Sequence, residues 1–172
     1  VGRRHRRRLG TVDADPAAVV VQAGSAPDLP VLDAAVAACR ACPRLVAWRE
    51  EVAATRRAAF RDQEYWGRPV PGFGPADARI VILGLAPAAH GGNRTGRMFT
   101  GDESGNFLFR ALHAVGLANQ PESTAPGDGL ALSGALLTAA VRCAPPDNRP
   151  LPEEFAACRE YVRRERAAMP DA

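Results

Sequence analysis

The sequence predicts an α/β fold built around a parallel sheet. Two short runs, ARIVILGLAP (78–87) and GALLTAAVRC (134–143), are apolar and are typical of buried strands. Each is followed by a loop and then by a helical pattern. A repeated order of strand, loop and helix implies parallel pairing through right-handed crossovers. With 172 residues, the chain is long enough for one domain with a real core.

Four stretches have the apolar spacing of helices. Val31, Leu32, Ala35 and Val36 fit one face of a short helix that ends at the first cysteine pair. The other three helices are expected at residues 43–60, 102–117 and 153–169. In the third helix, one apolar face is expected to contain Phe107, Leu108, Ala111, Leu112 and Val115.

The region before these elements differs in composition. Residues 1–30 contain RRHRRR and then Ala, Pro, Gly, Asp and Ser without sustained periodicity, which predicts a disordered basic arm before a domain at 31–172. Such an arm suits either a nucleic-acid tether or a solvated leader. The net charge is only +3, and every positively charged residue is an arginine. No apolar run reaches the roughly 18 residues of a membrane span, and no secretory signal is evident. The expectation is a cytoplasmic protein.

The cysteines form two pairs, Cys39 with Cys42 and Cys143 with Cys158. They are either four buried thiols or the four thiolate ligands of one metal site. Both zinc and a [4Fe–4S] cluster accept four cysteines. Zinc sites usually combine two close C-x2-C pairs, so the wide spacing of the second pair favours iron–sulfur. Such a site would join the first predicted helix to the second strand and the last helix.

A glycine-rich stretch, GLAPAAHGGNRTGRMFTGD (84–102), directly follows the first predicted strand. Loops after parallel strands are where open α/β sheets bind ligands, and glycine lets the backbone approach a flat or anionic ligand. The stretch lacks the lysine of a P-loop, so hydrolysis of a nucleoside triphosphate fits poorly. Asp102 stands where a helix N-cap would, and a capping aspartate beside a pocket can also hold a water.

Four segments together resemble a known family. The glycine-rich stretch, YWGRPVPGFG, CRACPRLVAWREE and VRCAPPDNRP are similar to the type b, or family 5, uracil-DNA glycosylases of bacteria and archaea. The resemblance covers roughly residues 31–165. It implies a three-layer α/β/α sandwich around a four-stranded parallel sheet, of which about two strands are present here, and a [4Fe–4S] cluster on the four cysteines.

The resemblance also implies a function and a set of site residues. The function is monofunctional hydrolysis of the N-glycosidic bond of uracil in DNA, which leaves an abasic site, and related members accept other deaminated bases such as hypoxanthine. Asp102 would position or polarise the attacking water, Asn148 would contact the base, and Phe99 would stack on it. The remaining substrate-binding residues implied are Gly84, Ala86, Pro87, Ala88, His90, Gly91, Asn93, Arg94 and Arg97. The two arginines are expected to contact phosphate.

Two departures qualify this expectation. Ala86 and Ala88 stand where other classes place a polar residue, which leaves Asp102 as the nearest substitute, and the alanines of LTAAVRC are consistent with relaxed base specificity. The family continues with two further strands and a histidine motif near HVSRQN. We therefore expect a C-terminally truncated fragment that acts as a monomer, binds its cluster poorly and turns over slowly. The alternatives are a non-catalytic iron–sulfur module that binds nucleic acid, and a zinc-stapled α/β protein.

Overall fold

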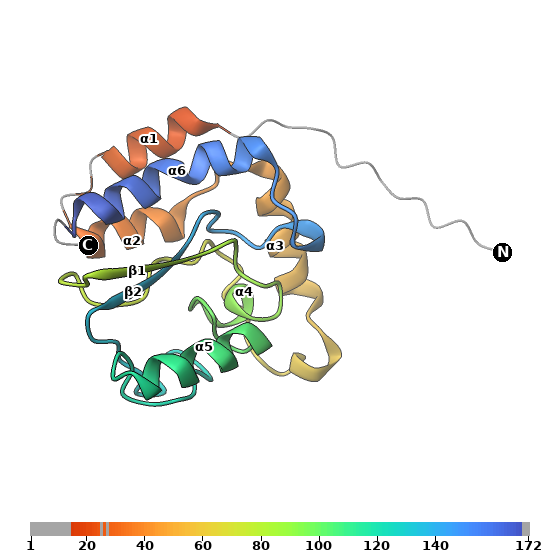
Figure 1. Cartoon of the computed structure of the whole chain (residues 1–172). Helices are drawn as coiled ribbons and strands as arrows, with labels where there is room; N and C mark the ends of the chain where they lie inside the picture. The colour runs from red at the N-terminus through yellow and green to blue at the C-terminus, as the bar shows by residue number, and fades with distance from the viewer. Residues whose placement is uncertain (1–14, 25, 27, 170–172) are drawn as a thin grey trace.

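The sheet lies between two layers of helices (Figure 1). The computed structural model describes residues 15–24, 26 and 28–169. The two strands are β1 (Ile80–Gly84) and β2 (Ala135–Ala139). The helices that cover one face are α1 (Pro16–Gly24), α2 (Leu29–Ala38) and α6 (Pro152–Ala167). The helices on the other face are α4 (Gly92–Thr95) and α5 (Glu103–Ala114), and α3 (Pro43–Thr55) flanks the layers. The predicted α/β class is confirmed.

The strands pair in parallel, as predicted, with Ile80 opposite Ala135 and Gly84 opposite Ala139. Every residue of β2 is buried. Leu136 packs in the cluster beneath α1, α2 and α6, whereas its neighbour Leu137 packs against the α5 side, as the alternation of a strand requires. The far edge of β2 is covered by an antiparallel bridge between Phe73 and Leu137.

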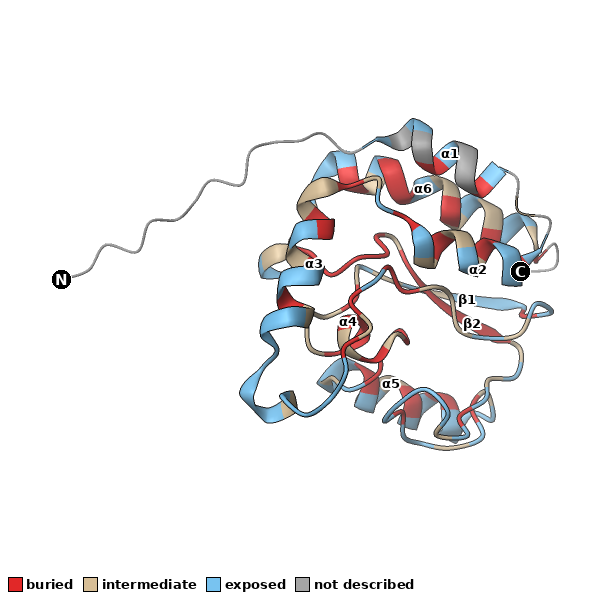
Figure 2. Ribbon diagram, turned by 180° about the vertical axis from the view of Figure 1, so that it is seen from behind, coloured by how far each residue is buried: buried red, intermediate tan, exposed pale blue. Residues whose placement is uncertain are grey.

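Strand β1 is not buried as predicted. Ile80, Val81 and Leu83 are exposed, and β2 is its only strand partner among the described residues. Figure 2 shows this contrast as a mostly pale blue β1 beside a red β2. An apolar edge strand without a neighbour offers unpaired backbone groups to another chain segment. The expectation of a buried first strand is therefore wrong.

The structure also corrects the predicted disordered arm. Helix α1 occupies Pro16–Gly24, inside the stretch 1–30, and packs along α6 (Figure 1). Val19 and Ala23 are fully buried. They lie four residues apart, which places them on one helix face, but this short stretch shows no sustained apolar periodicity from which a helix could be recognised. Residues 1–14, with the arginine run, lie outside the described residues.

Two helices differ in detail from the prediction. The helix expected at 43–60 ends at Thr55, because Arg56 adopts a positive φ of 52°, and a short 3₁₀ turn, η1 (Ala58–Phe60), follows. Helix α5 buries Phe109 and Leu112, whereas Phe107 and Val115 are 78% and 70% exposed. The helix carries apolar residues on two neighbouring faces, and only packing decides which one turns inward.

A buried charged network joins α6 to the end of β2. The Glu165 carboxylate accepts hydrogen bonds from the Thr138 hydroxyl at 2.8 Å and from the Arg142 guanidinium at 2.5 Å. All three side chains are almost fully buried. A buried charge that loses its partner is costly because water no longer solvates it.

The described helices include none that is long and apolar enough to cross a membrane.

Replacing Glu165 is expected to destabilise the fold severely. Glu165→Ala leaves the Arg142 charge buried and unpaired, so the free energy of unfolding should fall by about 3–5 kcal/mol. Glu160→Ala is the matched control on the same helix, because Glu160 pairs with the more exposed Arg163 and Arg164. Its cost should stay below about 1 kcal/mol. Chemical denaturation measures both, and equal costs would contradict a special role for the buried network.

Asp33, on α2, lies near this network and is itself half-buried. Burial raises its pKa from 3.8 to about 6, the negative charge of Glu165 acts in the same direction, and Arg142 opposes the change. A carboxyl group whose pKa is higher in the folded state binds its proton more readily there than in the unfolded chain. Stability is therefore lost as the pH rises through about 6.

Asp33→Asn is expected to stabilise the protein at pH 7 to 8. Because Asp33 keeps partial contact with water, we expect a gain on the order of 1 kcal/mol. The difference from wild type should close as the pH falls from about 6 toward 4. Thermal unfolding across this pH range, with Asp62→Asn as the exposed control, tests the expectation. A gain that is independent of pH would show that ionisation of Asp33 is not its cause.

Candidate functional site

The candidate site lies where two loops leave the carboxyl ends of the strands. Residues 85–102 follow β1, and residues 140–151 follow β2. Because the strands are parallel, both loops begin at the same edge of the sheet, which is where open α/β sheets bind ligands.

An open cavity of about 670 Å³ forms between these loops, η1 and the start of α5. The predicted site residues that line it are Ala88, His90, Gly91, Arg94, Asp102 and Asn148. The fold therefore brings both predicted catalytic residues to one cavity, although 46 residues separate them in the sequence.

The two carboxylate oxygens of Asp102 have different surroundings. Its Oδ1 accepts a hydrogen bond of 2.9 Å from the Gly105 backbone N–H, which makes it the N-cap of α5, as predicted. Its Oδ2 faces Gly91 so closely that a Cβ on that glycine would lie 2.5 Å away. The cap fixes the carboxylate at the cavity wall, and the absence of a side chain at Gly91 gives it room.

Asn148 is held by a tight turn. After two prolines, Asp147 and Asn148 both adopt φ of 55°, a left-handed conformation that Asp and Asn tolerate better than most residues. The turn is braced by Arg44, whose guanidinium donates to the Arg149 carbonyl at 3.0 Å and to Glu154 at 2.9 Å. The exposed amide of Asn148 therefore projects from a fixed backbone.

His90 is joined to a residue that the sequence analysis missed. Its Nδ1 lies 3.1 Å from the Tyr65 hydroxyl, and the two rings meet edge to face. Partial burial lowers the pKa of His90, and the positive charges of Arg57 and Arg94 add to the effect. The imidazole is therefore neutral at pH 7. The motif YWGRPVPGFG contains Tyr65, but nothing in its local pattern pointed to the histidine.

Arg97 does not face the cavity, which corrects its predicted phosphate contact. Its guanidinium is buried and binds the Asp128 carboxylate at 2.6 and 3.0 Å, with further bonds to Ser123 and Thr100. This pairing lowers the pKa of Asp128. The contact anchors the loop that follows α5, so Arg97 stabilises the fold around the site.

Five other predicted residues lie beside the cavity rather than in its wall. Gly84, Ala86 and Pro87 form the chain leading into the loop. Asn93 is fully buried and its Nδ2 donates to the Arg49 carbonyl at 3.2 Å. Phe99 directs its ring at Gly84, where a Cβ would lie 2.8 Å from Cζ, and it packs partly against the α5-side core. Stacking by Phe99 stays a prediction.

Arg94 lines the cavity but is engaged by the protein. Its guanidinium lies 4.1 Å from the centre of the Phe60 ring and donates to the His90 carbonyl at 2.7 Å and to Gln63. Its free capacity for a phosphate is therefore limited. Arg57 is exposed on the same cavity wall, so its side chain is more available to a phosphate than that of Arg94.

Several lining residues were not among the predicted site residues. They are Arg57, Phe60, Ala89, Gly101, Glu103, Asn106, Ser123 and Thr124. Asn106 is the one that periodicity indicates, because it stands four residues after Asp102 and so shares its helix face. The pair Ser123 and Thr124 belongs to a long loop whose path depends on its tertiary contacts.

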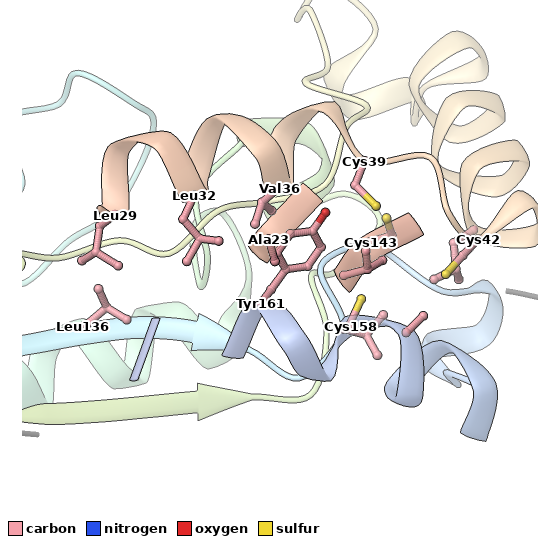
Figure 3. Packing of buried hydrophobic residues seen from close by; sticks show 14 of the residues in the cluster. Ala23, Leu29, Leu32, Val36, Cys39, Cys42, Leu136, Cys143, Cys158 and Tyr161 are labelled. Carbon is pink, nitrogen blue, oxygen red and sulfur yellow. The ribbon is translucent and has the colours of Figure 1, made fainter. Parts of the chain in front are cut away.

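The four cysteines come together from three segments of the chain. All are free, buried and part of one core cluster, and Figure 3 shows their sulfur atoms pointing toward one another. Burial raises the pKa of Cys143 to about 12, an effect that the charge of Arg49 opposes. Among the described residues, no group of three or more His, Cys, Asp or Glu side chains is placed so that it could hold a metal ion. A single ion needs its ligands to converge on one point, whereas each iron of a four-iron cluster binds a different thiolate. The donor set therefore fits such a cluster.

Gly91→Ala is expected to disturb Asp102. The added Cβ would stand 2.5 Å from Oδ2 and 3.2 Å from both Ala88 Cβ and the Thr100 carbonyl. We expect a loss of about 1–3 kcal/mol in unfolding free energy from overpacking. Asp102→Ala should cost less in this background than in wild type, because it removes the clash. Gly24→Ala, with its nearest atom at 3.6 Å, is the control. Additive costs in the double-mutant cycle would argue against the contact.

Comparisons with known proteins agree on one family. Residues 71–172 match the family model of the Uracil DNA glycosylase superfamily. The chain is 61% identical over 134 residues to the Type-5 uracil-DNA glycosylase of Thermus thermophilus, covering 78% of this chain and 60% of that protein. It is 57% identical over 143 residues to that of Mycobacterium tuberculosis, covering 83% and 53%. It is 51% identical over 131 residues to that of Pyrobaculum aerophilum, covering 76% and 57%. The chain thus spans little more than half the length of these curated relatives.

Proposed function

The chain belongs to the uracil DNA glycosylase superfamily, and on that premise we propose that it serves base-excision repair by removing uracil from DNA. The reaction hydrolyses the N-glycosidic bond and leaves an abasic site. Hypoxanthine and other deaminated bases are proposed as further substrates. The observation that supports this best is the meeting of Asp102 and His90, from the loop after β1, with Asn148, from the loop after β2, on one open cavity.

The proposed reaction begins with a nucleotide turned out of the duplex, because a base inside the stack is out of reach. The bond from the sugar C1′ to the base N1 breaks, and its electron pair leaves with the base. The Asp102 carboxylate, fixed by its bond to the Gly105 N–H, orients a water toward C1′ and accepts its proton. Asp102 lines the open cavity, which leaves space for that water.

Stabilisation of the departing anion is assigned to neutral donors. The amide of Asn148 lies on the same cavity as the carboxylate and donates hydrogen bonds without adding a charge. A neutral His90 also keeps one ring N–H. When Nδ1 accepts from the Tyr65 hydroxyl, that proton is on Nε2, which can donate to the departing base together with the amide of Asn148. The bond to Tyr65 holds the ring in position for this. Such donors aid a reaction most where negative charge develops.

We propose that Cys39, Cys42, Cys143 and Cys158 hold a [4Fe–4S] cluster, with zinc as the alternative. When bound, the cluster would supply a cross-link between the end of α2, the loop after β2 and α6. It would lie away from the cavity, since none of the four cysteines lines it. Four free cysteines suit a reducing compartment, and we propose a cytoplasmic protein that acts as a monomer.

Asp102→Asn separates capping from catalysis. Asparagine caps a helix about as well as aspartate, so stability should change little, whereas the rate of abasic-site formation should fall by about 10²–10⁴-fold. Asn148→Ala should lose about 10²–10³-fold, and Asp147→Asn, which lies outside the cavity wall and keeps a residue that tolerates the left-handed turn, should remain near wild type. Alkaline cleavage of a uracil-containing duplex after single-turnover incubation measures all three.

The outcomes distinguish the competing functions. Strand cleavage that depends on uracil and on Asp102 supports the glycosylase. Retained binding to the duplex without any abasic site would instead favour the non-catalytic module. Zinc in place of iron in the purified protein would favour the zinc-stapled alternative. A duplex containing hypoxanthine, run in parallel, tests the wider substrate range.

A further inference from the structure

Arg49 is a buried cation with an unusual set of partners. It lies on α3, is 2% exposed, and donates from Nη1 to the Cys143 sulfur at 2.9 Å and from Nη2 to the Cys39 carbonyl at 3.1 Å. Its Nε has no hydrogen-bond partner among the described residues. A guanidinium withdrawn from water normally pairs with a carboxylate.

The carboxylates near this region are already engaged. Glu50 feels the charge of Arg49 but is bound to Arg40 at the surface. The other arginine buried beside the cysteines, Arg142, has its own partner in Glu165. No salt bridge of Arg49 occurs in the described part of the chain. The groups that Arg49 faces are therefore the cysteines.

We propose that Arg49 is the counter-charge of the metal-bound thiolates, and that its hydrogen bond to Cys143 controls how tightly the metal group is held and how readily it is reduced. The inference rests on the proposed four-cysteine site. Metal binding turns thiols into thiolates, so the site gains negative charge where Arg49 already stands. Hydrogen bonds to cluster sulfurs and local charge both set the reduction potential.

The same residue connects the cysteines to the candidate site. The Arg49 carbonyl accepts the hydrogen bond from Asn93 Nδ2, and Asn93 lies between His90 and Arg94 in the glycine-rich loop. One residue thus contacts a ligand sulfur through its side chain and the cavity loop through its backbone. Arg49 acts as a positioning residue for the loop and as the electrostatic partner of the metal group.

Three variants separate charge from hydrogen bonding. Arg49→Lys keeps the charge and N–H donors, Arg49→Gln keeps N–H donors without the charge, and Arg49→Met keeps neither. The full chain is reconstituted anaerobically with ferric and ferrous iron and sulfide or, in a separate sample, with zinc, and metal per chain and visible absorption are recorded. Arg40→Gln, which breaks a surface ion pair nearby, is the matched control.

Metal retention should fall in the order wild type, Lys, Gln, Met. Release to a chelator should be about 10–100-fold faster in Arg49→Met than in wild type, as for other residues that support metal ligands. One electron from the titrant reduces the cluster without bond changes, and loss of the positive charge disfavours it. At a fixed potential the ratio of reduced to oxidised cluster should fall about tenfold, which is 59 mV for one electron.

The outcomes separate this proposal from the one on which it rests. Wild-type protein that takes up neither iron nor zinc overturns both. Wild-type protein with metal, together with unchanged release and potential in Arg49→Met, overturns only the role of Arg49. If Arg49→Met does not fold, the comparison of Arg49→Lys with Arg49→Gln decides. Equal metal loss in those two variants would exclude charge as the cause.

Discussion

The candidate site depends on backbone contacts that only glycine permits. A Cβ at Gly105 would lie 1.8 Å from the Phe99 carbonyl, and one at Gly91 would lie 2.5 Å from Asp102. These two glycines let the loop after β1 lie directly on the first turn of α5. The close contact brings the capping carboxylate to the cavity wall and leaves one of its oxygens beside open space. The glycine-rich composition of the loop thus has a steric cause at these two positions.

Buried arginines fix the geometry around that contact. Arg97 binds Asp128 and anchors the loop after α5, and Arg142 binds Glu165 and ties α6 to the end of β2. Arg44 holds the Asn148 turn through the Arg149 carbonyl. Arg97 and Arg44 each bind a carboxylate with two nitrogens of the guanidinium fork, whereas Arg142 binds Glu165 through Nη2 alone. All three contacts join segments that are distant in sequence. These arginines therefore stabilise the fold, in a chain whose positively charged residues are all arginines.

The sequence predicted the order and type of the main elements because their signals are local. Apolar runs gave the strands, and Asp102 gave the start of α5. Helix α1 was missed because the short stretch Pro16–Gly24 shows no sustained apolar periodicity, and the inward face of α5 was misassigned because two apolar faces compete. The meeting of Asp102 with Asn148 came from family resemblance. Tyr65 and the burial of Arg97 depend on tertiary packing, which local patterns do not contain.

The uncovered edge of β1 has a geometric consequence for the cavity. Its backbone groups can receive one more strand, and Ile80, Val81 and Leu83 offer that strand an apolar neighbour. A strand added parallel to β1 would have its carboxyl end at the same edge of the sheet as Gly84. The turn that leaves it would then emerge beside the mouth of the cavity and supply a further wall. The loop that follows a strand added in parallel at this edge would therefore lie at the same end of the sheet as the loops that line the cavity.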